Sequence, residues 1–160
     1  MKILAIDPGY ERIGIAILEK DSRGEQTLVY SECFKTSAKI PFYERVQKIG
    51  TKVAEIIKKH KPRALAIEKL YFTTNQKTAM GVAEARGVII YEAIQSKLKI
   101  FEYTPMEIKV AVTGYGKAVK QDVLLMTKKL IALPKNKPMF DDEVDAVAIG
   151  LTCFAIEKNP

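Results

Sequence analysis

Histidine and cysteine are scarce in this sequence, which limits the metal and redox sites that it can contain. The 160 residues include one histidine, His60, and two cysteines, Cys33 and Cys153, which lie far apart in the chain. Neither a CxxC redox pair nor a zinc knuckle can be formed from them. We therefore expect both cysteines to be buried, reduced thiols, and any metal site to use oxygen ligands.

Long apolar runs are also absent. No stretch of about 18 apolar residues occurs, and the apolar start at residues 3–6 stops at Asp7, which excludes a membrane span and a signal peptide. Linkers, repeats and low-complexity segments are missing too, and 48% of the residues are hydrophobic. We expect residues 1–160 to form a single domain of a cytoplasmic protein, neither disordered nor fibrous.

Positively charged residues are in excess. Lysine and arginine number 26 against 19 acidic residues, which leaves a net charge of +7. Such a balance favours anionic partners, nucleic acid first among them, although a charge that serves only solubility is the simpler explanation.

The spacing of apolar residues predicts a mixed α/β fold. Alternating or short apolar runs predict strands at residues 2–7, 13–18, 27–34, 64–68 and 99–103. Spacings of three and four, with capping residues, predict helices at residues 41–61, 76–97, from 104 onward, 120–132 and 141–156. Short connections join the first three strands into an antiparallel meander. We expect a five-stranded mixed sheet, with parallel strands after the meander, flanked by helices.

Two acidic residues, Asp7 and Glu68, end apolar strands. Each projects near core-facing residues, where a charge is costly without a partner. Open α/β sheets place their sites at the carboxyl ends of strands, so the repeated placement points to a shared site. A turn or capping role would explain either residue singly.

A further group of acids, Asp141, Asp142, Glu143 and Asp145, opens the last predicted helix. Acids complement the dipole at a helix N-terminus, and this role alone would explain some of them. Asp145 shares a helix face with both Asp142 and Asp141, at spacings of three and four. Glu143 lies about 200° around the helix from Asp145, so we expect it to face solvent.

These acids form an all-oxygen cluster, and hard oxygen ligands select Mg²⁺ or Mn²⁺ over zinc. Clustered carboxylates suit an anion-binding protein only when metal reverses the local charge. A two-metal site does this while it grips a scissile phosphate. The sequence therefore predicts metal-assisted phosphodiester hydrolysis.

Aromatic and basic residues near the acids are candidate DNA contacts. Tyr71 and Phe72 follow Glu68 closely and suit stacking on an exposed base, although packing in the core explains them equally well. Lys109, Lys117 and Lys120 surround a glycine-containing loop suited to phosphates, with a solvated surface as the alternative.

Together, these motifs resemble the RuvC-type Holliday junction resolvases. The shared motifs run in family order over nearly the whole chain: Ile6-Asp7-Pro8-Gly9, Leu65-Ala66-Ile67-Glu68 with Tyr71/Phe72, Ala85-Arg86-Gly87, Gly114-x-Gly116-x-Ala118-x-Lys120, Leu133-Pro134 and Asp142-x-x-Asp145-Ala146. The resemblance implies an RNase H-like fold, a homodimer, and paired hydrolytic nicking of four-way junction DNA in recombination and repair. It also implies Mg²⁺, replaceable by Mn²⁺, at two ions per active site, and a branch-migration motor partner of the RuvA and RuvB type.

The resemblance assigns roles to particular residues. It implies that Asp7, Glu68, Asp142 and Asp145 are the metal-binding catalytic acids, which selects Asp142 over Asp141. Tyr71 corresponds to the junction-contacting aromatic residue. Lys109 and Lys120 correspond to basic residues near the cut strand.

The helix at residues 76–97 is the candidate dimer interface. One of its faces carries Arg86 among small and apolar residues, namely Ala79, Val82, Ala83 and Ile90. Burial against the protein's own sheet would explain the same pattern.

Other functions remain open on the sequence alone. Asp7, Gly9 and Gly14 are similar to the first phosphate loop of the actin and sugar-kinase ATPases, which need two such domains. A YqgF-like RNA-processing nuclease of the same fold shares Arg12, Ile13 and Gly14, but the remaining motifs fit a resolvase better. A non-catalytic DNA-binding protein would need no cluster of acids.

Overall fold

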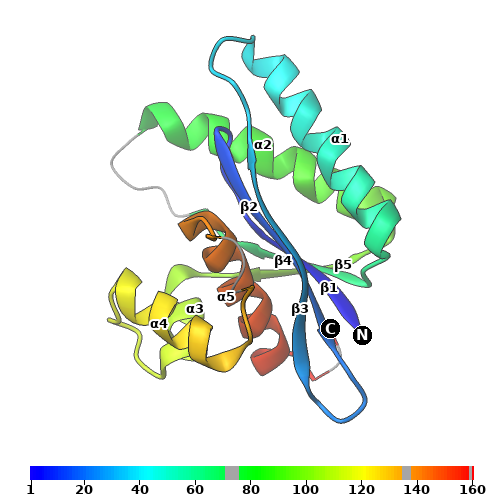
Figure 1. Ribbon diagram of the computed structural model, residues 1–160. Helices are drawn as coiled ribbons and strands as arrows, with labels where there is room; N and C mark the ends of the chain where they lie inside the picture. The colour runs from blue at the N-terminus through cyan, green and yellow to red at the C-terminus, as the bar shows by residue number, and fades with distance from the viewer. Residues whose placement is uncertain (71–75, 135–137, 159) are drawn as a thin grey trace.

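The computed structural model describes residues 1–70, 76–134, 138–158 and 160. In chain order, its elements are β1 (Lys2–Asp7), β2 (Arg12–Lys20), β3 (Gln26–Lys35), α1 (Phe42–His60), β4 (Ala64–Glu68), α2 (Gln76–Gln95), β5 (Lys99–Tyr103), α3 (Pro105–Thr113), α4 (Lys120–Leu130) and α5 (Asp141–Ile156) (Figure 1). Within this described part of the chain, no helix combines the length and apolar character needed to cross a membrane.

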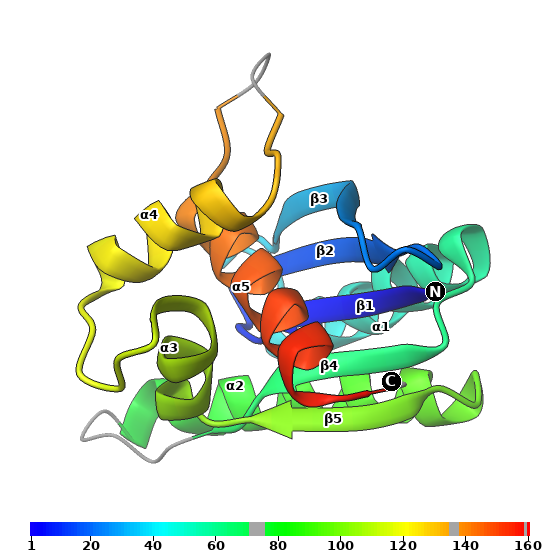
Figure 2. The same cartoon turned by 90° about the horizontal axis from the view of Figure 1, so that it is seen from below.

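The five strands form one mixed sheet in the order β3-β2-β1-β4-β5 (Figure 2). β1 pairs antiparallel with β2, and β2 pairs antiparallel with β3. β1 also pairs parallel with β4, which pairs parallel with β5. The mixed five-stranded sheet expected from the sequence is confirmed. β2 and β3 are longer than expected because their pairing continues from Arg12–Lys35 to Lys20–Gln26.

Helices cover both faces of the sheet. α1 and α2 lie on one face, and α5 crosses the other face with α3 and α4 beside it (Figures 1 and 2). The α1–α2 face carries large branched side chains: Leu4, Ile6, Ile13, Ile15, Ile17, Leu65 and Ile67. The α5 face instead carries many small residues, among them Ala5, Ala16, Ala64 and Ala66. Small side chains let a helix approach the sheet closely.

Two glycines make the approach of α5 possible. A Cβ atom added at Gly14 in β2 would lie 1.8 Å from the backbone oxygen of Asp142. A Cβ atom at Gly150 in α5 would lie 2.5 Å from Cδ1 of Leu18. The absence of a side chain at Gly14 lets the first turn of α5 lie against the sheet beside the carboxyl end of β1, and its absence at Gly150 lets a later turn of the helix pack on Leu18.

Local signals position α3 and α4. The Thr104 hydroxyl accepts a hydrogen bond from the Glu107 N–H at 3.2 Å, and the Glu107 carboxylate accepts one from the Thr104 N–H at 2.7 Å. This capping box starts α3 directly after β5, as expected from the sequence. Gly114, with φ of 76°, ends α3. The chain then turns into α4, which begins with Lys120.

Candidate active site

Three of the four predicted acids line one cavity. Asp7 at the end of β1, Glu68 at the end of β4 and Asp145 in α5 border a cavity of about 300 Å³. Lys109 of α3 and Lys120 of α4 lie in the same wall. Asp7 and Glu68 share a cavity because β1 and β4 are parallel neighbours, so that their carboxyl ends meet at one edge of the sheet.

Burial and mutual repulsion perturb two of these carboxyls. Burial, then the nearby charges of Glu68, Asp145 and Asp142, raise the pKa of Asp7 to about 7. Burial and the charge of Asp145 raise the pKa of Glu68 to about 7 as well. Such pKa values indicate negative charge held close together in a poorly solvated place.

The donor set fits a hard divalent cation. The charged groups that line the cavity are three carboxylates and two lysines, with no histidine or cysteine among them. Oxygen donors of this kind suit Mg²⁺ or Mn²⁺, and a bound cation would relieve the repulsion that raises the two pKa values. In the present arrangement, no three of the described His, Cys, Asp and Glu side chains are grouped closely enough to hold one ion.

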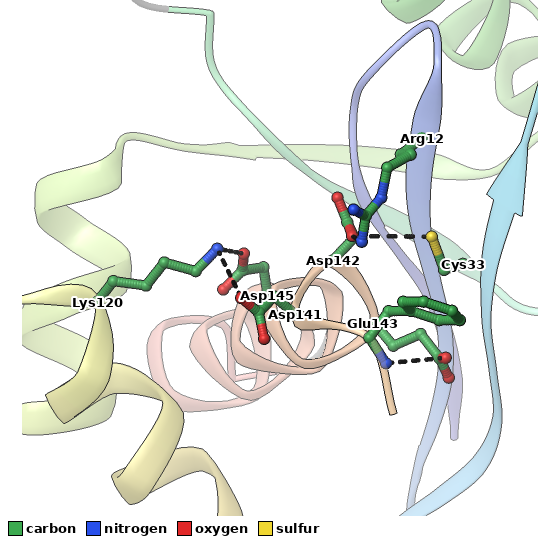
Figure 3. Close-up of polar contacts among 8 residues, drawn as sticks. Arg12, Cys33, Lys120, Asp141, Asp142, Glu143 and Asp145 are labelled. Atoms are coloured by element: carbon green, nitrogen blue, oxygen red, sulfur yellow. Dashed lines mark hydrogen bonds and ion pairs between the residues drawn. The ribbon is translucent and has the colours of Figure 1, made fainter. Parts of the chain in front are cut away.

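Lys120 balances the negative charge of two acids on α5, Asp145 and Asp141. Its Nζ atom lies 3.0 Å from Oδ2 of Asp145 and 3.7 Å from Oδ2 of Asp141, and Figure 3 shows both carboxylates facing this lysine. Burial raises the pKa of Asp145, while the Lys120 hydrogen bond and charge oppose that shift. Lys120 therefore acts as an internal counter-ion of the cavity.

The fourth acid, Asp142, lies at the other side of the first turn of α5. Its carboxylate forms an ion pair with Arg12 of β2, and Oδ2 also lies 3.7 Å from Sγ of Cys33 in β3 (Figure 3). Asp142 is not among the residues that border the cavity. The structure thus brings Asp7, Glu68 and Asp145 together and leaves Asp142 next to them, held by Arg12.

The expectation that Glu143 faces solvent is wrong. Only 3% of Glu143 is exposed, and Ser31 of β3 donates a hydrogen bond to Oε2 at 2.7 Å. Its Oε1 accepts a hydrogen bond from the Phe140 N–H at 3.3 Å. Because α5 lies close to the sheet, β3 packs against the side of the helix opposite Asp145. Glu143 lies on that side and is therefore buried. The expectation that Cys33 is buried also fails in part, because Cys33 is half-buried, whereas Cys153 is fully buried.

Arg86 is a site residue whose role the sequence did not indicate. Its Nε donates to the backbone oxygen of Glu68 at 3.1 Å, and its guanidinium pairs with Glu102 of β5. Arg86 therefore fixes the end of the strand that carries Glu68. The signal available was the Ala85-Arg86-Gly87 motif, but the partners of Arg86 lie in other elements.

The interface expected on α2 stays a prediction, because the structure describes a single protomer. Ala79, Val82, Ala83, Arg86 and Ile90 are half-buried within the protomer, and Arg86 is engaged with Glu68 and Glu102. The exposed apolar side chains of α2 lie on a different face: Met80, Tyr91 and Ile94. The residues fully buried against the sheet are Ala85, Ile89 and Ala93.

The remaining DNA-contact candidates lie outside the cavity wall or outside the described residues. Lys117 is exposed in the loop between α3 and α4 and does not border the cavity. Tyr71 and Phe72 fall outside the residues that the structure describes. Their predicted roles stay predictions.

Comparison with known proteins identifies the family. The family model described as "Crossover junction endodeoxyribonuclease RuvC" matches residues 3–153. A protein of that name from Halothermothrix orenii is 42% identical over 94% of this chain and 90% of its own length. Another, from Pelotomaculum thermopropionicum, is 41% identical over 97% and 93%.

Solved structures agree. The Thermus thermophilus RuvC structure superimposes with a TM-score of 0.86 at 32% identity, over 96% of this chain and 94% of the other. The same protein in complex with a Holliday junction substrate gives 0.87 at 32% identity, over 95% and 92%. The yeast mitochondrial Holliday junction resolvase shares the fold alone, with a TM-score of 0.71 at 11% identity over 96% and 77%.

These matches confirm the RNase H-like fold expected from the sequence, and they favour a crossover junction endodeoxyribonuclease over the YqgF-like alternative. They extend over nearly the whole chain, including all four predicted acids. The chain therefore belongs to the RuvC family of crossover junction endodeoxyribonucleases.

Proposed function

We propose that this protein is a structure-selective endonuclease that resolves Holliday junctions by metal-dependent, hydrolytic nicking of two DNA strands in recombination and repair. The observation that carries the proposal is the meeting of Asp7, Glu68 and Asp145 with Lys109 and Lys120 in one cavity. The names of the curated relatives, and the junction bound by the Thermus thermophilus protein, support it.

The acids would hold the metal. We assign Asp7, Glu68, Asp142 and Asp145 as catalytic metal ligands for Mg²⁺, with Mn²⁺ as a substitute and two ions per site. When bound, the ions supply an activated water and stabilise the leaving oxygen of the phosphodiester. Arg86 keeps Glu68 in place through its backbone oxygen. Ile108, Val123 and Ile149 form an apolar part of the cavity wall. The expected products carry 5′-phosphate and 3′-hydroxyl ends that a ligase can seal.

Basic side chains would position the DNA. Lys109 and Lys120 border the acids and can contact phosphates on either side of the scissile bond, while the exposed Lys117 extends this basic surface. Tyr71 and Phe72 stay the proposed aromatic contacts to unpaired bases at the branch point.

A homodimer would supply the second active site. Symmetric incision of a junction needs two identical sites, and we propose one site per protomer. The exposed residues Met80, Tyr91 and Ile94 of α2, together with the exposed Gly87, recur at helical spacing and provide an apolar stripe. We assign the two-fold interface to this stripe.

We further propose that residues 1–160 act as one nuclease domain on cytoplasmic DNA. Branch-migration motor proteins of the RuvA and RuvB type are the proposed partners. Co-purification of the junction-bound dimer with such a motor is the measurement for this assignment.

The test is nicking of a synthetic four-way junction in Mg²⁺ by the wild-type protein and by Asp7→Asn. The variant loses a metal ligand and one negative charge, so we expect nicking to be abolished while junction affinity is unchanged or higher. Glu55→Gln, an isosteric change at an exposed position of α1, is the matched control and should cut normally. Parallel loss of binding and cleavage in Asp7→Asn, or cleavage of structured RNA in place of the junction, would contradict the proposal.

A further inference from the structure

One of the four acids, Asp142, forms an ion pair with an arginine. Arg12 opens β2 and Asp142 lies 130 residues later at the start of α5, yet a guanidinium nitrogen of Arg12 donates to Oδ2 of Asp142 (Figure 3). The same oxygen lies within 3.7 Å of the Cys33 thiol. The partners of Asp142 therefore belong to β2 and β3, whereas Asp145, one turn later, borders the cavity.

The packing around Arg12 orients this ion pair. The guanidinium carbon lies 5.4 Å from the ring centroid of Phe140, the residue that caps the N-terminus of α5. A cation over an aromatic face is attracted by its quadrupole. Phe140 thus packs against the guanidinium that pairs with Asp142, while nearly half of the Arg12 side chain, 48%, stays exposed to solvent.

The two basic residues near the acids differ in what they do. Lys120 pairs with Asp145 from within the cavity wall, so its charge lies where a phosphate would bind. Arg12 pairs with Asp142 from outside this wall and so engages a carboxylate that we propose would hold the metal. A divalent cation and a guanidinium compete for the same carboxylate oxygen, and exposed ion pairs are weak enough to be exchanged.

We propose that Arg12 is a positioning residue: it is the internal counter-ion of Asp142, and a divalent cation must displace it to bring Asp142 into the metal site. The inference rests on the proposed function, because it takes Asp142 as a metal ligand. The ion pair holds the Asp142 carboxylate in one orientation before the metal arrives. Its cost is a lower affinity for the metal.

The test is Mn²⁺ binding, measured from the EPR signal of the free ion, for the wild-type protein and Arg12→Gln. Loss of the competing cation should tighten Mn²⁺ binding by roughly two- to fivefold, the range that corresponds to an exposed ion pair. A merely structural role predicts the opposite sign, because a loosened first turn of α5 would weaken Mn²⁺ binding.

Two further variants distinguish competition between Arg12 and the metal from the effect of removing any nearby positive charge. Lys35→Gln removes a cation that also lies over the Phe140 ring, 3.9 Å from its centroid, and has no contact with Asp142 among those found in the described residues. It should change Mn²⁺ affinity by less than about twofold, since solvent screens separated surface charges. In an Asp142→Asn background, Arg12→Gln should have no effect, because the shared oxygen charge is gone.

Equal Mn²⁺ affinities of wild type and Arg12→Gln, or equal gains from Arg12→Gln and Lys35→Gln, would overturn the inference. The titrations are repeated with Ca²⁺ competing on the junction-bound protein, so that weak binding to the free protein still yields a comparison. Tighter Mn²⁺ binding without junction cleavage would support the role of Arg12 and contradict the proposed function. The absence of any metal binding in either state would overturn both.

Discussion

Asp7 illustrates, at the scale of a single residue, how a buried carboxyl destabilises the protein that carries it. Its pKa is raised to about 7, first by burial and then by the neighbouring acids. The folded state therefore favours the protonated form, and holding the charged form costs free energy of folding. The residue that we propose as a metal ligand is therefore one that lowers the stability of the folded protein.

Replacing Asp7 by Asn should stabilise the metal-free protein. The folded-state pKa of Asp7 is raised. The contribution of Asp7 to the free energy of unfolding is therefore fully present at pH values below about 4, and it is lost as the pH rises to 7. The gain from Asp7→Asn should grow over that interval and reach about 1–3 kcal/mol at pH 8. Thermal unfolding in EDTA as a function of pH measures this, with Glu55→Gln as the pH-independent control. A gain that is constant with pH would contradict the assignment.

Replacing Lys120 by Ala should weaken DNA binding and also remove the positive charge that balances Asp145. Loss of one phosphate contact should reduce the salt dependence of junction affinity by about one unit of log–log slope. Loss of the Asp145 counter-ion should in addition slow nicking. Lys128→Ala, an exposed lysine near the other end of α4, is the matched control. An unchanged slope in titrations from low to high salt would leave Lys120 as a partner of Asp145 alone.

At the scale of elements, the position of α5 decides the site. The helix lies on the small-residue face of the sheet, and Gly14 admits the Asp142 backbone at its first turn. This contact sets the distance between the acids of α5 and the carboxyl end of β1. The site is therefore built by the packing of a helix as much as by the acids themselves.

Gly14→Ala should push α5 away from β1. The added Cβ would lie 1.8 Å from a backbone oxygen, which has no rotamer by which to yield. We expect a loss of about 2–3 kcal/mol in unfolding free energy, together with weaker metal binding.

Gly150→Ala provides the comparison. Its Cβ would meet the tip of the Leu18 side chain, which can move, and alanine also favours the helix. Its unfolding free energy, measured in urea, should fall by less than that of Gly14→Ala. Equal losses, or normal Mn²⁺ affinity in Gly14→Ala, would show that α5 can shift without harm.

These elements also mark how far sequence reasoning reaches. The strand ends that place Asp7 and Glu68 follow from local patterns of apolar residues, so the sequence predicted both. The burial of Glu143 depends on β3, more than 100 residues away in the chain, and the helix periodicity contains no information about it. The same holds for Arg12 and Arg86, whose partners belong to other elements.

At the scale of the whole molecule, a second protomer should bind through α2. Tyr91→Arg places a charge in the exposed apolar stripe and should halve the mass in solution from about twice 17.9 kDa to the single-chain value. The monomer should bind junctions more weakly and lose the pairing of its two nicks, while each site stays intact.

Leu125→Arg is the control for the dimer, because it introduces the same charge at an exposed apolar position of α4. Analytical ultracentrifugation compares the two variants, and a junction held on a cruciform plasmid distinguishes single from paired nicks. A dimer that survives Tyr91→Arg would place the interface on another face.

The order of the elements along the chain decides when the acids of the cavity become available during synthesis. Along the chain, the acids of the cavity come from β1, from β4 and from α5, which follows the other elements that the structure describes. A domain generally folds as a unit, and synthesis begins at the N-terminus. A nascent chain that ends after β4 contains Asp7 and Glu68 but lacks Asp145. If Asp145 holds the metal as we propose, the nascent chain cannot cut DNA until α5 has been synthesised and has folded onto the sheet.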